Sequence, residues 1–221
     1  MAALEWDKIE NRTGENGADH GVIYRLDQTG AYKNAEVWDG LTAVNMSPEG
    51  AEAQKMYADN ILYGTLRGAE TSKGTIEAFR FPESFRECDG TKLIDAAVEG
   101  LYATGQQRQP FGFSWRTLIL DSNGTEIGYK IHLTYGNTAS PSSQDNSTIN
   151  ESPEYKSFSW EFESVPVPVP GLRPSARLEL DSRKVPAKKM EAALDVLYGR
   201  KTEPAKLPTP AELVALMKAA A

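Results

Sequence analysis

The sequence predicts a mainly β protein, an antiparallel β-sandwich or partial barrel with a flanking α-helix and a short C-terminal helix. In three segments of the middle of the chain, apolar and polar residues alternate with the period of a half-buried strand. Turn-forming stretches such as Asp121-Ser122-Asn123-Gly124 separate these segments and favour hairpins. After residue 186 the apolar spacing changes to that of a helix, so the helices are expected near the C-terminus.

The N-terminal part of the chain is predicted to contain an arm followed by short strands. Residues 1–20 are polar and rich in Gly and Asn, so we expect an arm or long loop there. Strands are expected at 21–25, at 35–38 leading into 41–44, at 61–66 and at 75–81. Ser47 and Pro48 suit a helix start and favour a short helix up to Tyr57, with a tight loop as the alternative because Gly50 weakens a helix.

The three clearest strands carry one apolar row each. These rows are Phe111, Phe113, Trp115, Thr117 and Ile119; Tyr129, Ile131, Leu133 and Tyr135; and Phe158, Trp160 and Phe162. His132 lies on the polar side of the second row, where we expect a solvated or interface residue. Residues 137–152 contain little to bury and are predicted to form a long exposed loop.

The C-terminal part is predicted to hold one strand and two helices. A strand is expected at 176–180, and a helix at 186–198 places Met190, Ala193, Leu194 and Leu197 on one face before Gly199 ends it. Thr209 to Glu212 form a capping box that starts a last helix. That helix is too short to be stable alone and should dock on its own domain or on a neighbouring subunit. The predicted units are therefore an arm (1–20), a β-sandwich domain with its flanking helix (21–199), and a linker with the C-terminal helix (200–221).

The charge of the chain argues against tight nucleic-acid binding. The net charge of the 221 residues is −7, and residues 1–172 carry 14 Lys and Arg against 25 Asp and Glu. Tight DNA binding needs a surplus of basic residues, which this part lacks. An acidic surface that DNA slides past is consistent with the charge, and so is simple solubility. The acidic N-terminus and the lack of a long apolar run predict a protein that is made in a cytoplasm and does not enter a membrane.

No constellation of residues predicts catalysis or a cofactor. The two histidines, His20 and His132, are far apart, and the single Cys88 forms no internal disulfide and lacks an assignable base. The chain contains no nucleophile elbow, zinc ligand set or phosphate-binding glycine loop. Glu161 and Glu163 share a strand face about 7 Å apart, a spacing close to that of glycosidase carboxylates, but adjacent acids on a solvent-facing strand are far commoner. We therefore predict no enzyme activity, no cofactor and no metal.

Several stretches, in order along most of the chain, resemble the major tail tube protein family of bacteriophages with long, non-contractile tails. These stretches are His20 to Tyr24, Ser47 to Glu52, Tyr57 to Asn60, Gly74 to Ala78, Cys88 to Gly90, Gly105 to Arg108, Gly128 to Leu133 and Ser157 to Phe162. The resemblance implies a structural subunit that forms stacked hexameric rings. Such a tube encloses the tape measure protein during assembly, meets tail terminator and tail-tip proteins, and conducts DNA during ejection without binding it specifically. It also implies a virion protein of the phage tail that assembles in the host cytoplasm.

By this resemblance, loops and arms reach neighbouring subunits, and three regions are candidate assembly contacts: the arm 2–19, the loop 47–60 and the loop 137–152. The candidate residues within the two loops are Ser47, Pro48, Glu49, Gly50, Tyr57, Asp59, Asn60, Asn137, Ser140, Pro141 and Asp145. Two alternatives remain open. One is a carbohydrate-binding β-sandwich, suggested by Trp38, Trp115, Trp160 and nine tyrosines. The other is a different structural protein of the phage tail or head, because these folds overlap.

Overall fold

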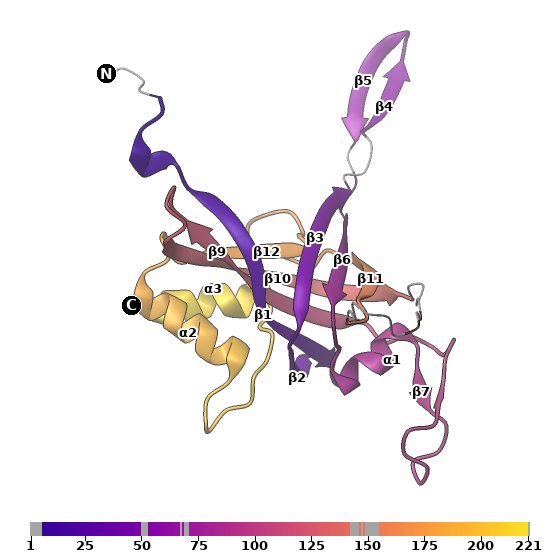
Figure 1. The fold of residues 1–221 in the computed structure, drawn as a ribbon. Helices are drawn as coiled ribbons and strands as arrows, with labels where there is room; N and C mark the ends of the chain where they lie inside the picture. The colour runs from indigo at the N-terminus through magenta and orange to yellow at the C-terminus, as the bar shows by residue number, and fades with distance from the viewer. Residues whose placement is uncertain are drawn as a thin grey trace.

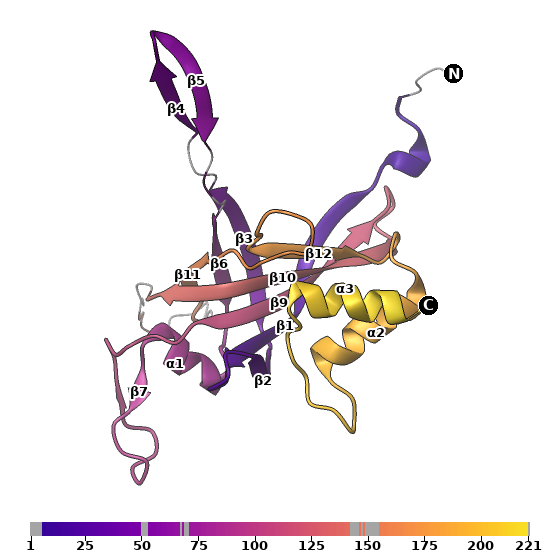
Figure 2. The same cartoon turned by 180° about the vertical axis from the view of Figure 1, so that it is seen from behind.

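A computed structural model of the chain describes residues 6–49, 53–66, 68, 71–141, 146, 148 and 155–220. Its elements in chain order are η1 (Ile9–Asn11), β1 (Gly14–Leu26), β2 (Tyr32–Trp38), β3 (Leu41–Glu49), β4 (Gln54–Ala58), β5 (Ile61–Leu66), β6 (Thr71–Ala78), η2 (Glu83–Phe85), α1 (Arg86–Asp89), β7 (Lys92–Leu93), β8 (Tyr102–Ala103), β9 (Phe111–Leu120), β10 (Glu126–Ser140), β11 (Phe158–Ser164), β12 (Arg177–Asp181), α2 (Ala187–Tyr198) and α3 (Pro210–Ala219). Figure 1 and Figure 2 show them from opposite sides. The mainly β, antiparallel architecture with flanking helices confirms the predicted fold class.

Sheet A consists of β2, β1, β9, β10 and β12, and each neighbouring pair is antiparallel. β9 and β10 form a hairpin in which the backbone N–H of Asp121 donates to the carbonyl oxygen of Thr125 at 2.9 Å. Gly124 in this turn has a φ of 78°, a conformation that glycine adopts without steric strain. The predicted hairpin turn at 121–124 is therefore confirmed.

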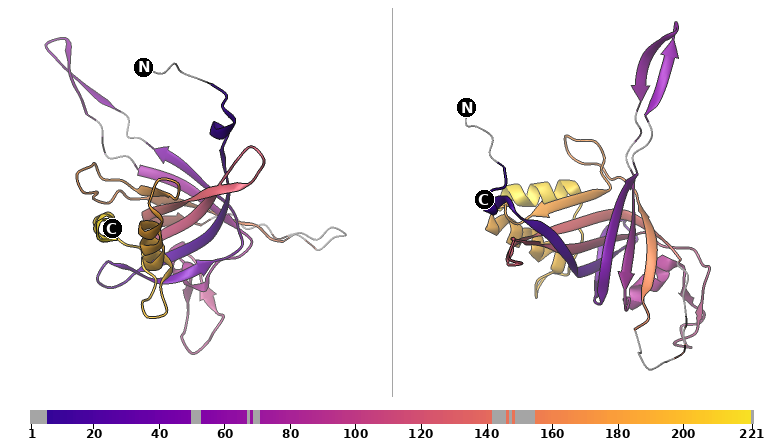
Figure 3. Two further views of the ribbon diagram at one scale, coloured as in Figure 1. Left: turned by 90° about the vertical axis from the view of Figure 1, so that its left-hand side faces the viewer. Right: turned by 45° about the horizontal axis from the view of Figure 1, so that its top comes forward.

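Sheet B consists of β3, β6, β11 and the end of β10. The 15-residue strand β10 pairs with β9 along most of its length and then, from Thr138 to Ser140, with β11. It therefore belongs to both sheets and joins them through one continuous strand. In Figure 1 and in the right panel of Figure 3, the strands of sheet B cross those of sheet A. The two sheets thus form a sandwich with one shared corner.

The core between the two sheets is built largely from aromatic side chains that the alternating pattern points inward. Its buried members are Ile23, Trp38, Ile76, Ala78, Phe85, Cys88, Phe111, Phe113, Trp115, Ala139, Trp160 and Phe162. The ring of Phe85, contributed by η2, lies 4.6 Å from that of Trp38 and 5.1 Å from that of Trp160, centroid to centroid. Tilted and edge-to-face contacts of this kind stabilise a core beyond the area they bury. The short segment with η2 and α1 therefore closes one end of the sandwich.

The two C-terminal helices cover the other face of sheet A, as the left panel of Figure 3 shows. Met190, Ala193 and Leu197 of α2 are buried there, as predicted from their spacing, and Gly199 follows the helix with a φ of 79°. The capping box at the start of α3 is also confirmed, because Thr209 and Glu212 exchange both hydrogen bonds. Leu213 packs in the same cluster. The last helix therefore docks on its own subunit, which is one of the two expected arrangements.

Three predicted boundaries are wrong. β1 begins at Gly14, so residues 14–19 belong to sheet A and not to the arm. The helix expected from Ser47 to Tyr57 is wrong, since Ser47 still belongs to β3 and Tyr57 lies in β4, and residues 50–52, where the alternative tight loop would fall, lie outside the described residues. Residues 137–140 of the loop expected at 137–152 belong instead to β10, and most of the remaining residues of that range lie outside the described part of the chain. At residues 14–19, 47–49 and 137–140 a strand continues through mostly polar residues that carry no alternating apolar signal.

Two segments extend away from the sandwich at opposite ends, as Figure 1 and Figure 2 both show. β4 and β5 form a two-stranded sheet of their own, and β7 and β8 form another. Asp59 and Asn60 make the turn between β4 and β5 with φ values of 50° and 60°, as a two-residue hairpin turn requires. Among the helices that the structure describes, none is long and apolar enough to cross a membrane.

Candidate assembly surfaces

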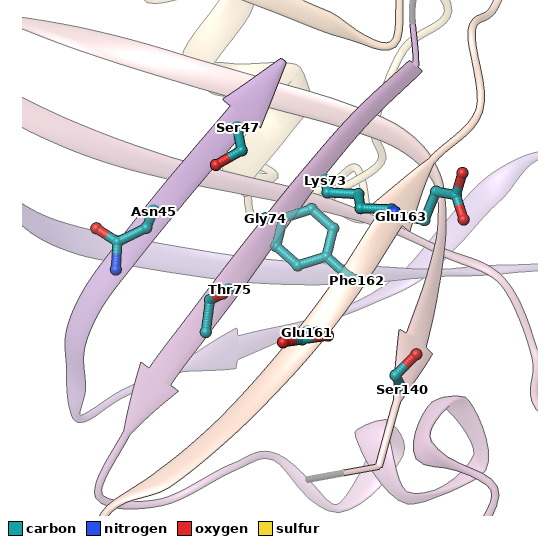
Figure 4. A pocket seen from close by; sticks show the side chains of 9 residues that line it. All are labelled: Asn45, Ser47, Lys73, Gly74, Thr75, Ser140, Glu161, Phe162 and Glu163. Atoms are coloured by element: carbon teal, nitrogen blue, oxygen red, sulfur yellow. The ribbon is translucent and has the colours of Figure 1, made fainter. Parts of the chain in front are cut away.

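The outer face of sheet B forms a shallow hollow of about 510 Å³. Figure 4 shows its lining, which consists of Asn45, Ser47, Lys73, Gly74, Thr75, Ser140, Glu161, Phe162 and Glu163. The hollow follows from the period of two, because Ile76 and Trp160 point into the core while their neighbours point outward. The core residue Phe162 also borders the hollow, since Gly74 beside its ring has no side chain. The open face therefore carries short polar and charged side chains on a rigid sheet.

Acidic side chains dominate the charge of this face. Glu161 and Glu163 of β11 are exposed, and β6 places Thr75 opposite Glu161 and Lys73 opposite Glu163. Gly74 leaves room for the neighbouring core, since a Cβ atom there would lie 2.5 Å from the Phe162 ring and 2.8 Å from the carbonyl oxygen of Asn45. The two glutamates that share this strand face are thus part of a broad open surface and do not line a closed cleft.

The structure separates the candidate contact residues of the 47–60 region. Ser47 faces the hollow on sheet B, and Pro48 and Glu49 end β3 by pairing with β6. Tyr57 lies on the projecting β4–β5 hairpin with 68% of its surface exposed, and Asp59 and Asn60 form the tip of that hairpin. Gly50 lies outside the described residues. The predicted region therefore contributes to two different surfaces.

The candidates of the 137–152 region are also divided. Asn137 is fully buried, where its Nδ2 donates to Thr134 Oγ1 at 2.8 Å and its Oδ1 accepts from Ser164 Oγ at 2.7 Å. Ser140 lines the hollow on sheet B, and Pro141 is exposed beside it. Asp145 lies outside the described residues. The side chain of Asn137 thus ties β10 to β11 inside the subunit, at the point where β10 enters sheet B.

His132, which was expected to be a solvated or interface residue, is buried at one end of sheet A. His132 is only 1% exposed and stacks on Trp115 with a centroid distance of 5.0 Å. Its Nε2 is 2.8 Å from Thr117 Oγ1, and its Nδ1 is 2.8 Å from a guanidinium nitrogen of Arg177. Burial, and next the positive charge of Arg177, lower the pKa of His132. The expectation of a solvated His132 is wrong, because β9 and β12 supply these partners and Glu15 of β1 lies 3.2 Å from Nε2; a contact of His132 with another subunit stays a prediction.

Ion pairs hold the first residues of β1 onto this end of sheet A. Lys130 Nζ lies 2.9 Å from a carboxylate oxygen of Glu15 and 3.0 Å from one of Glu179. Asp19 accepts two hydrogen bonds from Arg116, at 2.8 Å and 2.7 Å. The Arg116 guanidinium is the main reason that the pKa of Asp19 is lowered. Charged pairs therefore fasten a segment whose composition indicated a free arm.

The surroundings of Cys88, of the possible metal ligands and of three tryptophans give no support to a reactive, metal-binding or sugar-binding site. Burial raises the pKa of the Cys88 thiol to about 12, so it carries almost no thiolate at neutral pH. Across the part of the chain that the structure describes, no three or more His, Cys, Asp or Glu residues are placed to hold a metal ion. Trp38, Trp115 and Trp160, which suggested a carbohydrate-binding surface, are at most 3% exposed. Rings buried in this way cannot stack on a sugar.

The chain matches a known protein family. A family model described as phage tail tube protein matches residues 3–161. This range begins well before His20, where the first of the resembling stretches starts. It ends within β11, before β12 and the two C-terminal helices. No curated protein matches the chain. Because the match covers well over half of the residues, the chain belongs to the phage tail tube protein family.

Proposed function

We propose that this protein is the structural subunit of a phage tail tube, in which stacked hexameric rings enclose the tape measure protein and conduct DNA during ejection. Membership of the tail tube family makes it a structural component of the phage virion. The observation that carries the finer proposal is sheet B, which has a covered inner face, an open polar outer face and a free edge at β3. The proposal includes no catalytic activity.

Closure of a ring gives the edge of sheet B a partner. β3 runs from Leu41 to Glu49 and, among the described strands, pairs only with β6. A strand edge of this length presents unpaired backbone N–H and C=O groups that readily join another strand. In the proposed ring, the edge at β3 of one subunit meets the opposite end of sheet B in the next subunit. Six such contacts join the sheets into one continuous inner wall.

The open face of sheet B is the surface that we assign to the lumen of the tube. Its exposed carboxylates, Glu161 and Glu163, outnumber the single lysine Lys73 among the residues that line the hollow. These carboxylates repel the negatively charged phosphates of DNA at short range. Short side chains such as Asn45 and Ser47 add little relief to the wall. A bore of this kind lets DNA pass without adhering to it.

The candidate contact residues fit this arrangement as two groups. Tyr57, Asp59 and Asn60 of the β4–β5 hairpin extend from the body and are proposed to contact a subunit of a neighbouring ring. Ser140 and Pro141 lie where β10 leaves sheet B and are proposed to contact the adjacent subunit of the same ring. Tape measure, tail terminator and tail-tip proteins complete the proposed set of partners, with assembly in the host cytoplasm.

The first test is electron microscopy of the purified protein at high concentration, with sizing chromatography beside it. The proposal predicts rings or hollow tubes. Glu161→Cys and Glu191→Cys then provide a matched pair, because both positions are exposed in the single subunit and Glu191 lies on α2 outside the sandwich. A maleimide attached to a folded protein should label both variants as subunits but only Glu191→Cys in tubes. Equal labelling of both variants in tubes would refute the assignment of the lumen.

A further inference from the structure

Two exposed apolar surfaces lie at opposite ends of the molecule. The first is the β4–β5 hairpin, where Tyr57, Ile61, Tyr63 and Leu66 each keep 60% or more of their surface exposed. The second is the segment 92–103 around β7 and β8, where Leu93, Ile94, Val98 and Leu101 are 39–59% exposed. In Figures 1 and 2 the first surface points up and the second points down, and the left panel of Figure 3 agrees. Each surface projects from the sandwich instead of packing on it.

The β4–β5 hairpin needs a partner. Its two strands contain no buried residue and, within the part of the chain that the structure describes, no third strand pairs with them. An isolated two-stranded hairpin is marginally stable in water, and exposed aromatic and aliphatic side chains on it favour association. Because the body of the subunit does not cover the exposed tyrosine and leucine side chains of this hairpin, only another molecule could bury them.

The segment 92–103 is a suitable receiver because it is fastened to the body. Tyr102 Oη donates to a carboxylate oxygen of Glu83, and the guanidinium of Arg86 lies over the Tyr102 ring at 4.2 Å. Asp95 caps the turn beyond β7 by accepting from the backbone N–H of Ala97 at 2.8 Å. The segment therefore offers exposed apolar side chains on an anchored support, with the acidic Glu99 among them.

We infer that the β4–β5 hairpin of one subunit docks on the 92–103 segment of a second copy of this chain in the next ring. This inference rests on the proposed tube. Both surfaces are apolar, and the exposed Lys55 of the hairpin complements Glu99 and Asp95 of the receiver. The two surfaces differ and lie at opposite ends, so their contact is heterologous and propagates along an axis without closing. A contact between two identical hairpins would instead be complete at a dimer.

The test is a chemical cross-link between the two surfaces in assembled protein. A Tyr63→Cys/Val98→Cys double variant is assembled under reducing conditions, checked by electron microscopy and treated with a short flexible bis-maleimide. Each subunit then carries one donor and one acceptor position, so denaturing electrophoresis should show a ladder of two, three and more linked chains. Each single variant should give at most dimers. The wild-type chain, whose only cysteine is the buried Cys88, gives the background level of cross-linking.

A Tyr63→Cys/Val214→Cys variant is the matched control, since Val214 is also exposed but lies on α3. Tubes that give no ladder, or an equal ladder from the control, would overturn the docking inference and leave the tube proposal intact. Should the double variant fail to assemble, Lys55→Glu is expected to lower the assembled fraction several-fold and added Glu99→Lys to restore it. Failure of that restoration would also overturn the inference. Wild-type protein that forms neither rings nor tubes would overturn the proposed function itself.

Discussion

Asn137 distinguishes a structural role from a contact role, because it is a candidate assembly residue in the sequence and a buried one in the structure. Replacing it with alanine removes two buried side-chain hydrogen bonds, each contributing about 0.5–1.5 kcal/mol. The hydroxyl of Ser164 also loses its acceptor, and a buried donor without a partner costs about 1–3 kcal/mol. We therefore expect Asn137→Ala to lower the free energy of unfolding by about 2–4 kcal/mol.

The assay is urea unfolding of the dilute, unassembled subunit, because association would stabilise the folded state and mask the effect. With a denaturant slope of about 2 kcal/mol per molar, the middle of the usual range, the midpoint should fall by roughly 1–2 M. Ser140→Ala is the matched control, since Ser140 lies on the same strand but is exposed, and its effect should stay within about 0.5 kcal/mol.

A change below about 0.5 kcal/mol in Asn137→Ala would refute this account. If such a variant also failed to form tubes at unchanged subunit stability, Asn137 would act as a contact between subunits. The buried pair with Ser164 would then rearrange on assembly. The structural account instead predicts that any loss of tubes follows the loss of subunit stability.

Three further perturbations test other parts of the fold. Gly74→Val should lower stability by about 1–3 kcal/mol in a thermal melt, because its Cβ would clash with Phe162 and with backbone, and an unchanged melting temperature would contradict that packing. Burial and Arg177 lower the pKa of His132 in the folded protein, so the unfolded chain takes up this proton at a higher pH than the folded chain does. The corresponding stability is therefore present above about pH 6.5 and is lost as the pH falls below it. His132→Gln should make the fall in unfolding free energy below that pH shallower, and an identical pH profile would rule His132 out as its source. Thr209→Ala should cost about 1 kcal/mol in chemical unfolding by removing the cap of α3, and a neutral result would mean that the cap is dispensable.

Strands with one buried face could be predicted from the sequence because their core contacts impose a period of two. Trp115, Leu133 and Phe162 each belong to such a row, and each is buried in the structure. The helix around Met190 and the capping box at Thr209 were equally readable, since their signals lie within one or two helical turns.

Elements whose stability comes from polar partners or from outside the subunit could not be predicted in this way. Asp19 lies in a strand because Arg116 of β9 holds it, and that pairing joins residues far apart in the chain. The partners that bury His132 come from β1 and β12, so its surroundings were equally hidden. The β4–β5 hairpin did carry a local signal, because the two-residue turn Asp59-Asn60 lies between two apolar runs. The residues Ser47 and Pro48 favoured a helix over the same region, and the turn signal was therefore not used.

Of the candidate assembly residues, the sequence could locate surface segments but not the faces to which they belong. Ser47 and Tyr57 are ten residues apart, yet one faces the hollow of sheet B and the other lies on a projecting hairpin. The lumen face that we propose, with Glu161 and Glu163, appeared in the sequence only as adjacent acids on one strand. Its extent depends on the pairing of β3, β6 and β11, which sequence periodicity does not determine.

The most direct test of the central claim is a cryo-electron microscopy reconstruction of tubes assembled from the wild-type protein. The account predicts a hollow tube of sixfold rings in which sheet B forms the inner wall and Glu161 and Glu163 face the bore. A tube with this face on its outer surface, or a protein that stays monomeric at high concentration, would contradict it.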